Sequence, residues 1–348
     1  MKIGIVNDLP MAMETLRRVV TKDDRHKVVW MAEDGKRAIE KCAEQVPDLI
    51  LMDLIMPVMN GVDSTRRIMK LSPCPILIVT ASVGGNSALV FEAMGAGALD
   101  VVATPVVNEK NNAGSQELLK KIERIGKLIG IKEKGLDDLP VRPVKIEVKS
   151  QEGPCLVVLG CSTGGPQALL EVLEVLPRDF SGSVVIVQHM DEQFTKGLAD
   201  WLNGQLELEV RIMKEGDHPR PGVVLIPSTN HHMIMHPNKS LGYSEEPKSN
   251  FYHPSVDVFF KSVSQYWRGK CIAILLTGMG RDGAEGMLAL YQQGHMTIAQ
   301  DQKTSVVYGM PKAAIDLHAA REILPLDTIG LRLKRLLTTD REKEKKHG

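Results

Sequence analysis

The chain has 348 residues, enough for two domains of ordinary size, and its 43 basic and 43 acidic side chains give a formal net charge of zero. This balance does not favour nonspecific binding to nucleic acid or to an anionic membrane. Five cysteines without a C-x-x-C pair are typical of core thiols in a reducing cytoplasm. No signal peptide is evident, and no apolar run approaches the ~18 residues of a membrane helix. We therefore expect a cytoplasmic protein without membrane insertion.

The first 130 residues alternate short apolar runs with helical segments. The expected strands are IGIV, KVVWMA, DLILMD, PILIVTA and LDVVATP, and the expected helices include MAMETLRRVV, GKRAIEKCAEQ, SALVFEAMGA and SQELLKKIERIGKLIG. This alternation predicts βα units on a parallel sheet. After Gly130 it stops, and the charged, proline-bearing residues 131–153 predict a linker.

The alternation resumes at Cys155 with the strands CLVVLG, SVVIVQH, VVLIP, CIAILLTG and MTIAQ, and with helices that include FTKGLADWLN and VDVFFKSV. The sequence therefore predicts an α/β protein with two doubly wound parallel-sheet domains joined by a linker. The boundaries that we predict are 1–125 for the first domain, 126–153 for a helix end and the linker, 154–338 for the second domain, and 339–348 for a charged tail. We expect this tail to be frayed.

Polar residues end several strands of the first domain. They are Asn7 and Asp8 after the first strand, Asp53 after the third, Thr80 after the fourth and Thr104 after the fifth. Parallel strands bring their carboxyl ends to one edge of the sheet. Carboxylates gathered there can hold Mg²⁺ and can attack a phosphoryl donor. A single aspartate at a strand end is more often a simple turn residue, so the interpretation depends on the longer motif.

The string LILMDLIMPVMNGVDSTRRI, followed by IVTAS, resembles the phosphoacceptor region of response-regulator receiver domains. The resemblance spans residues 1 to about 125. It implies that Asp53 is the phosphoacceptor, that Asp8 and Asp53 bind Mg²⁺, and that Thr80 is the switch hydroxyl that turns toward the phosphate.

Three positions depart from the receiver pattern. Asn7 stands where a second acid is usual, Thr104 stands where a lysine normally contacts the phosphate, and Val101 takes the place of a switch aromatic. A hydrogen bond to a charged group is often worth ~1.5–3 kcal/mol, and the loss of the lysine removes one. We therefore expect phosphorylation of Asp53 with weaker coupling to the output.

A second motif, Gly160-Cys161-Ser162-Thr163-Gly164, fits G-x-S-x-G between a strand and a helix. Its glycines could cradle a phosphate, or its turn could present Ser162 as a nucleophile. A phosphate-binding loop would place a lysine after the last glycine, and this sequence has none there. On its own, a small residue in such a glycine-rich turn is more often structural. A nucleophilic serine also needs a base and a group that orients the base.

Candidates for both groups follow other strands. His189 ends SVVIVQH, and Asp282 follows CIAILLTG before a helix. Separately, each has a simple structural alternative, and for Asp282 this is a helix N-cap. Together with Ser162 they predict a Ser-His-Asp site, in which loop 278–280 could expose amides to an oxyanion. The chain order Ser, His, Asp argues against the α/β-hydrolase fold, in which the acid precedes the histidine.

The segments GCSTGGPQAL, IVQHM, HPSVDVFF, LLTGMGRDGAEGM and TIAQDQKTSVVYGMPKAAI together resemble the catalytic domain of chemotaxis protein-glutamate methylesterases, the CheB family, over about residues 154–338. Within the family, the sequence is most similar to the WspF-like branch. The resemblance implies roles for five residues: nucleophile (Ser162), general base and acid (His189), orienting carboxylate (Asp282), backbone oxyanion donor (Met279) and neighbour of the nucleophile (Thr163). His253 stands where the family often has arginine.

A histidine cluster suggests a metal site as an alternative. It comprises His231, His232 and His236, but Pro227 and Pro237 argue against a single helix that presents all three. No thiolate or acidic ligand shares the segment, so we disfavour metal binding there.

The family resemblance implies hydrolysis of glutamate methyl esters on methyl-accepting chemoreceptors, with glutamine deamidation by the same nucleophile as a side activity. It implies Mg²⁺ for receiver phosphorylation, no cofactor for ester hydrolysis, and a chemotaxis-type histidine kinase as phosphodonor. Two alternatives stay open, namely a small-molecule esterase and a phosphorylation-responsive binding protein with a vestigial triad.

Overall fold

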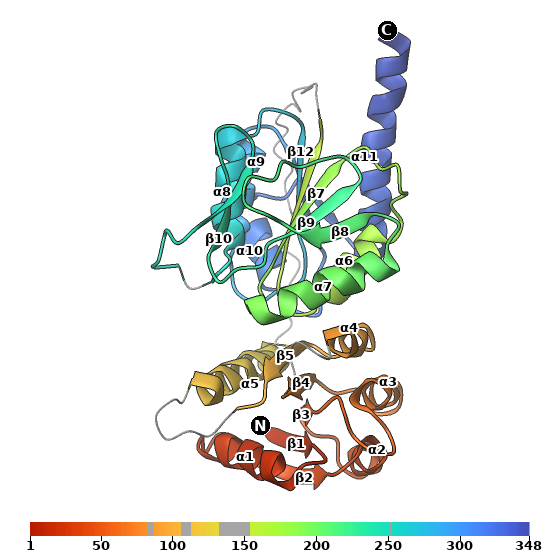
Figure 1. The fold of residues 1–348 in the computed structure, drawn as a ribbon, viewed down its shortest axis with the longest axis vertical. Coiled ribbons are helices and arrows are strands. Elements are labelled where there is room, and N and C mark those ends of the chain that lie inside the picture. Colours follow the sequence, from red (N-terminus) through yellow and green to blue (C-terminus); the bar gives the residue numbers. More distant parts are fainter. Residues whose placement is uncertain (82–86, 106–112, 132–153, 251, 348) are drawn as a thin grey trace. The chain divides into compact units, whose positions relative to one another are not determined.

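The computed structural model describes residues 1–81, 87–105, 113–131, 154–250 and 252–347. It divides into two compact units, Met1–Pro140 and Val141–Gly348 (Figure 1). The predicted linker lies outside the described residues from position 132 onward. None of the described helices is both long and apolar enough to cross a lipid bilayer.

The first unit is a five-stranded parallel sheet with the order β2-β1-β3-β4-β5. Its strands are β1 (Lys2–Val6), β2 (Lys27–Ala32), β3 (Leu49–Met52), β4 (Ile76–Thr80) and β5 (Asp100–Ala103). Its helices are α1 (Pro10–Thr21), α2 (Gly35–Glu44), α3 (Gly61–Leu71), α4 (Ser87–Gly95) and α5 (Ala113–Ile131). Figure 1 shows α1 and α5 on one face of the sheet and α2, α3 and α4 on the other. This is the predicted doubly wound arrangement.

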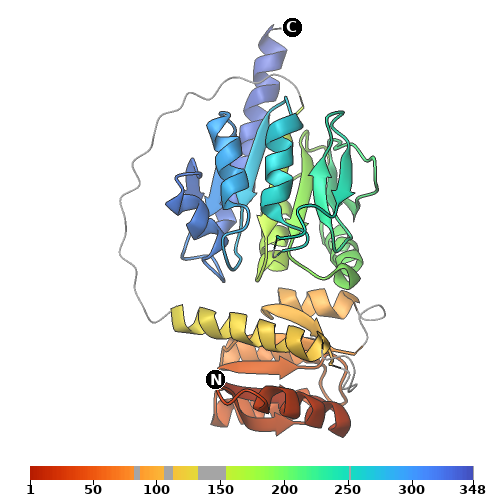
Figure 2. The ribbon, with the colours of Figure 1, turned by 90° about the vertical axis from the view of Figure 1, so that its left-hand side faces the viewer.

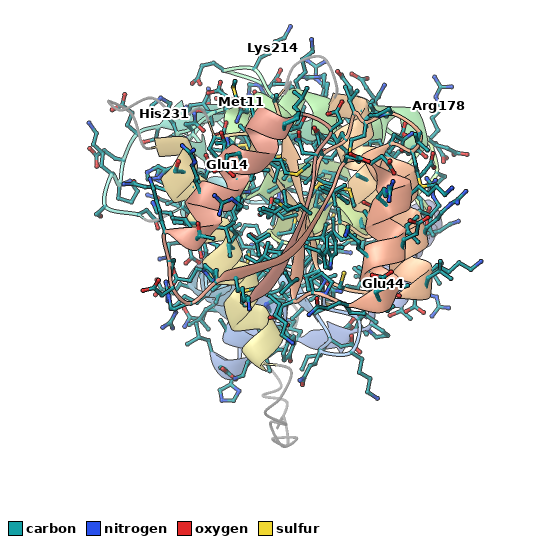
Figure 3. The ribbon with its side chains drawn as sticks, turned by 90° about the horizontal axis from the view of Figure 1, so that it is seen from below. Met11, Glu14, Glu44, Arg178, Lys214 and His231 are labelled. Carbon is teal, nitrogen blue, oxygen red and sulfur yellow. The ribbon has the colours of Figure 1, made fainter. Side chains whose placement is uncertain are left out.

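Local sequence explains how the helices of this unit are placed. On α1, Leu16, Val19 and Val20 are buried, whereas Met11 is exposed and Glu14 pairs with arginines of the same helix (Figure 3). Such one-sided burial is what an amphipathic helix over a sheet requires. At the start of α3, a Cβ on Gly61 would lie 2.1 Å from the backbone oxygen of Asp53. Only glycine therefore lets α3 approach the end of β3 so closely.

The second unit has a seven-stranded parallel sheet with the order β14-β13-β12-β6-β7-β9-β8 and a separate antiparallel hairpin, β10-β11. The strands are β6 (Leu156–Cys161), β7 (Ser183–Gln188), β8 (Glu209–Ile212), β9 (Val223–Ile226), β10 (His232–Met235), β11 (Leu241–Ser244), β12 (Cys271–Leu275), β13 (Met296–Gln300) and β14 (Glu322–Leu324). The helices are α6 (Gly165–Leu173), α7 (Glu192–Gln205), α8 (Val256–Tyr266), α9 (Ala284–Gln292), α10 (Met310–Asp316) and α11 (Leu326–His347).

The order of this sheet reverses at its centre. After β6 the chain adds β7, β8 and β9 on one side, and it later adds β12, β13 and β14 on the other. Figures 1 and 2 show α8 and α9 side by side on one face of the sheet, with α6 and α7 on the opposite face. In sheets of this kind the loops at the carboxyl ends of the two strands beside the reversal form a crevice where ligands bind. Here those two strands are β6 and β12.

Two features differ from the sequence expectations. The structure adds several elements that the apolar pattern does not single out, namely α3, β8, the β10-β11 hairpin, α10 and β14. Residues 339–347, where the sequence predicts a frayed tail, are helical as the last part of α11. The segment is rich in arginine, glutamate and lysine, which have high helix propensity, and it extends a helix that has already begun at Leu326.

Candidate functional site

Ser162 lies in a tight turn between β6 and α6. The amide of Gly165 donates to the Ser162 carbonyl oxygen at 2.8 Å, which closes the turn. Gly164 has a φ of +78°, a conformation that side chains rarely adopt, and a Cβ there would lie 2.8 Å from the Val306 side chain. A strand, a sharp turn and a helix in succession present the serine at the edge of the sheet, as the G-x-S-x-G motif predicts.

The loop after β12 lies directly against this turn. The Ser162 amide donates to the Thr277 carbonyl oxygen at 3.0 Å, and a Cβ on Gly278 would lie 2.9 Å from the Ser162 Cβ. The Thr277 hydroxyl also donates to the Thr163 carbonyl oxygen at 3.0 Å. Among the described residues, none accepts a hydrogen bond from the Met279 amide. The amide predicted as an oxyanion donor thus belongs to a loop that contacts the serine turn.

His189 and Asp282, which lie beyond the ends of β7 and β12, form a buried pair. The distance from His189 Nε2 to Asp282 Oδ2 is 2.7 Å, and the two side chains are 7% and 4% exposed. His189 Nδ1 is also buried and has no hydrogen-bond partner in the described part of the chain. Because an ionised carboxylate only accepts, Nε2 must carry the proton of the neutral ring. The lone pair that can receive a proton is therefore on Nδ1.

The Asp282 carboxylate also receives hydrogen bonds from the first turn of α8. Oδ1 accepts from the Ser255 hydroxyl at 2.7 Å and from the Asp257 amide at 3.1 Å, while Oδ2 accepts from the Val256 amide at 2.7 Å. Burial alone would raise the pKa of this carboxyl, but the hydrogen bonds from His189, Ser255 and Val256 and the His189 charge lower the pKa below its ordinary value. Asp282 is therefore an ionised partner for His189 at neutral pH.

Gln188, at the end of β7, connects the serine turn to the histidine. Its Nε2 donates to the carbonyl oxygens of Ser162 at 2.9 Å and of His189 at 3.0 Å, and its Oε1 accepts from the Cys161 thiol at 3.0 Å. Gln188 was not among the site residues predicted from the sequence. The only signal was a carboxamide within an apolar strand, where a buried polar group must find partners.

The histidine cluster, which the sequence already disfavours as a metal site, makes other contacts. His232 is buried in β10, where Nδ1 accepts from the Ser255 amide at 3.2 Å and Nε2 lies 3.3 Å from the Pro247 carbonyl oxygen. His236 instead lies 3.6 Å from Glu215. No group of three or more metal-ligating side chains is found in the described residues. His253, at the position where the family often has arginine, stacks on the His232 ring.

In the first unit, the predicted phosphoacceptor lies just beyond β3, beside the end of β1. The Asn7 side-chain amide donates to Asp53 Oδ2 at 2.8 Å, and Asn7 Oδ1 accepts from the Leu9 amide at 2.9 Å. Burial raises the pKa of Asp53 to about 6. The hydrogen bond from the Leu54 amide lowers this pKa, and the nearby charge of Asp8 raises it. Asn7 thus acts as a neutral donor where a second acid is usual.

The other predicted receiver residues lie on the neighbouring strands. Thr80 is buried at the end of β4, and its carbonyl oxygen accepts from the Thr104 amide at 3.0 Å. Val101 is a buried β5 residue paired with Ile78, so the position predicted for a switch aromatic is filled by a core side chain. Thr104 has no ammonium group with which to contact a phosphate.

The fold and these two sites define a class of protein, a response-regulator receiver followed by a hydrolase domain. Residues 3–112 match the response regulator receiver domain, and residues 157–333 match the CheB methylesterase model. The chain belongs to the CheB methylesterase family, as the sequence resemblance predicted.

Full-length relatives and a solved structure agree with this assignment. A Mesorhizobium japonicum protein named protein-glutamate methylesterase/protein-glutamine glutaminase is 51% identical, and the match covers 96% of this chain and 98% of that protein. A Pseudomonas fluorescens protein named protein-glutamate methylesterase/protein-glutamine glutaminase 1 is 52% identical, and the match again covers 96% of this chain and 98% of that protein. The crystal structure of the Thermotoga maritima CheB methylesterase catalytic domain is 36% identical with a TM-score of 0.51, and the match covers 53% of this chain and all of that chain.

Proposed function

We propose that this protein hydrolyses glutamate methyl esters on methyl-accepting chemoreceptors, releases methanol and restores the carboxylates, under the control of its receiver domain. The observation that carries the proposal is the buried His189–Asp282 pair, in which His189 Nδ1 has no hydrogen-bond partner among the described residues. His189 directly follows β7, which pairs with β6, the strand that leads into Ser162. The relatives named protein-glutamate methylesterase/protein-glutamine glutaminase support this substrate. The alternatives are a small-molecule esterase and a binding protein with a vestigial triad.

The proposed reaction has two steps. Ser162 Oγ attacks the ester carbonyl carbon while its proton passes to His189 Nδ1, and the Met279 amide stabilises the oxyanion. His189 then gives the proton to the methoxy group, which leaves as methanol, and the glutamyl group remains on Ser162. Water, deprotonated by His189, then attacks the acyl carbon, the bond to Ser162 Oγ breaks, and His189 returns the proton to Oγ, which releases the glutamate carboxylate. A glutamine side chain would pass through the same acyl-enzyme with ammonia as leaving group, which accounts for the second part of the relatives' names.

In the receiver, we propose Asp53 as the phosphoacceptor, Thr80 as the switch hydroxyl and a chemotaxis-type histidine kinase as phosphodonor. Mg²⁺ often binds through one or two carboxylates and keeps several waters, and the nearby charge of Asp8, which contributes to the raised pKa of Asp53, supports such a pair. The ion would supply positive charge for phosphoryl transfer. All five cysteines are buried free thiols, which supports a cytoplasmic location.

Asp53→Asn is expected to abolish stimulation by a small phosphodonor such as acetyl phosphate and to leave basal hydrolysis unchanged. The amide cannot form the acyl phosphate, whereas the esterase residues stay intact. Methanol release from methylated receptor membranes would be measured with and without the donor. Asp63→Asn, on the exposed surface of α3, is the matched control and should respond like wild type. Stimulation of Asp53→Asn to the wild-type level would refute Asp53 as the phosphoacceptor.

Mg²⁺ binding to the receiver is expected to weaken as the pH falls through about 6, the pKa to which burial raises Asp53. Above this pH the carboxylate is ionised and available to the ion, and below it a proton must first be displaced, so affinity falls by up to ~10-fold per pH unit. Titration calorimetry of the full chain between pH 5 and 7.5 would measure this. Asp53→Asn should bind Mg²⁺ more weakly and lose most of the pH dependence. Identical pH profiles for the two proteins would contradict the assignment.

A further inference from the structure

Tyr252 covers one face of the His189 imidazole. The ring centroids are 4.2 Å apart and the two planes are inclined by only 6°. Asp282 contacts the edge of the same imidazole through Nε2. The imidazole is thus held from two directions, by a carboxylate in its plane and by an aromatic ring against its face.

The phenol end of Tyr252 reaches the loop after β12. Its hydroxyl lies 3.5 Å from the Met279 carbonyl oxygen, and a Cβ on Gly280 would lie 2.6 Å from the same hydroxyl. Gly280 has a φ of +87°, so the loop keeps a glycine where the tyrosine approaches. One side chain therefore contacts both the proposed base and the loop of the proposed oxyanion donor.

We infer that Tyr252 is a positioning residue for the proton transfer between Ser162 and His189, an inference that rests on the proposed function. When the Ser162 oxygen bonds to the ester carbon, its proton moves to Nδ1 and the imidazole becomes a cation. The face of an aromatic ring is electron-rich and attracts a cation placed over it. The stack also resists rotation of the imidazole away from the serine. Both effects favour the transition state over the resting enzyme, so Tyr252 acts on kcat.

The decisive comparison is between Tyr252→Phe, which keeps the aromatic face, and Tyr252→Leu, which keeps apolar bulk without it. Methanol release from methylated receptor membranes would give kcat and KM for both. Tyr252→Leu is expected to lower kcat by about 10-fold or more with little change in KM, because small displacements of a catalytic group are costly. Tyr252→Phe is expected to stay within about threefold of wild type, because it keeps the aromatic face that stacks on the imidazole.

Tyr266→Leu, at the far end of α8, is the matched control for the loss of a tyrosine from the same domain and should keep wild-type kcat. Thermal unfolding would verify that each variant is folded, and Tyr252→Met offers a second non-aromatic side chain if the leucine variant is not. Equal kcat values for the phenylalanine variant and the folded non-aromatic variant would overturn the inference. Ser162→Ala, assayed in parallel, distinguishes a failure of the Tyr252 inference from a failure of the proposed function. Full activity of Ser162→Ala would overturn the proposed function itself.

Discussion

Ser162→Ala is expected to lower the kcat for methanol release from methylated receptors by roughly 10⁴- to 10⁶-fold. Alanine removes the oxygen that would form the acyl-enzyme and leaves no other nucleophile in the turn. The turn itself should survive, because the hydrogen bonds that hold it use the Ser162 backbone: its amide donates to Thr277, and its carbonyl oxygen accepts from Gly165 and Gln188. Loss of activity without loss of stability is therefore the expected combination.

Methanol release over time, with thermal unfolding of the same samples, measures both quantities. Ser264→Ala is the control for loss of a serine from this domain, since Ser264 is a buried α8 residue whose hydroxyl donates to the Lys261 carbonyl oxygen of the same helix. Near-normal turnover by Ser162→Ala would eliminate the covalent mechanism. If wild type hydrolyses a small activated ester but leaves methylated receptors intact, the small-molecule esterase replaces our proposal. If Ser162→Ala also matches wild type in receptor binding and wild type releases no methanol, the binding-protein alternative is supported.

Asp282→Asn is expected to lower kcat by about 10³- to 10⁴-fold, because the side chain preserves shape but not hydrogen-bond polarity. An amide nitrogen at the position of Oδ2 would donate toward His189 Nε2. It would also place its N–H groups against the N–H of Val256, which would lose its acceptor. The proton of the ring would then move to Nδ1, and the lone pair required by Ser162 would be lost. At the position of Oδ1, the same nitrogen would oppose the Asp257 amide.

The measurement is again receptor demethylation, with Asp316→Asn as control, since Asp316 forms an exposed ion pair with Lys312 on α10. A second expectation concerns stability. Asp282→Asn should unfold at a lower temperature than wild type because a buried helix N-terminus loses its anion. Wild-type turnover in a folded Asp282→Asn protein would show that the carboxylate does not control the histidine tautomer.

The positions of Ser162, His189 and Asp282 were predictable because each follows an apolar run. Parallel strands present their carboxyl ends at one edge of a sheet, so residues at such ends are drawn together whatever their separation along the chain. The lateral order of the strands was not predictable in this way. Nothing in the apolar pattern says that β12 pairs with β6, although that pairing places the Met279 loop against the serine turn.

Other parts of the site carry no periodic signal at all. Tyr252 precedes α8 in an irregular segment, where neither helix nor strand spacing constrains a side chain. The nitrogen of His189 that faces Asp282 depends on one side-chain rotation, which a sequence does not encode in any local pattern. The β10-β11 hairpin is too short to show a clear alternation of apolar and polar residues. Its buried His232 was considered as a metal ligand, but its ring accepts a hydrogen bond from the Ser255 amide at the start of α8.

The reversal of strand order at β6 has a consequence for the time at which the enzyme becomes active during its own synthesis. A ribosome completes Ser162 and His189 well before it reaches Asp282, and the sheet lacks one of the two neighbours of β6 until β12 has been made. Pairings between segments distant in sequence form late, because the intervening chain must first be ordered. Nascent chains and fragments cut before β12 therefore contain Ser162, the proposed nucleophile, without Asp282, the proposed orienting acid. By the proposed mechanism, hydrolysis of receptor methyl esters is expected only from copies that already contain both β12 and Asp282.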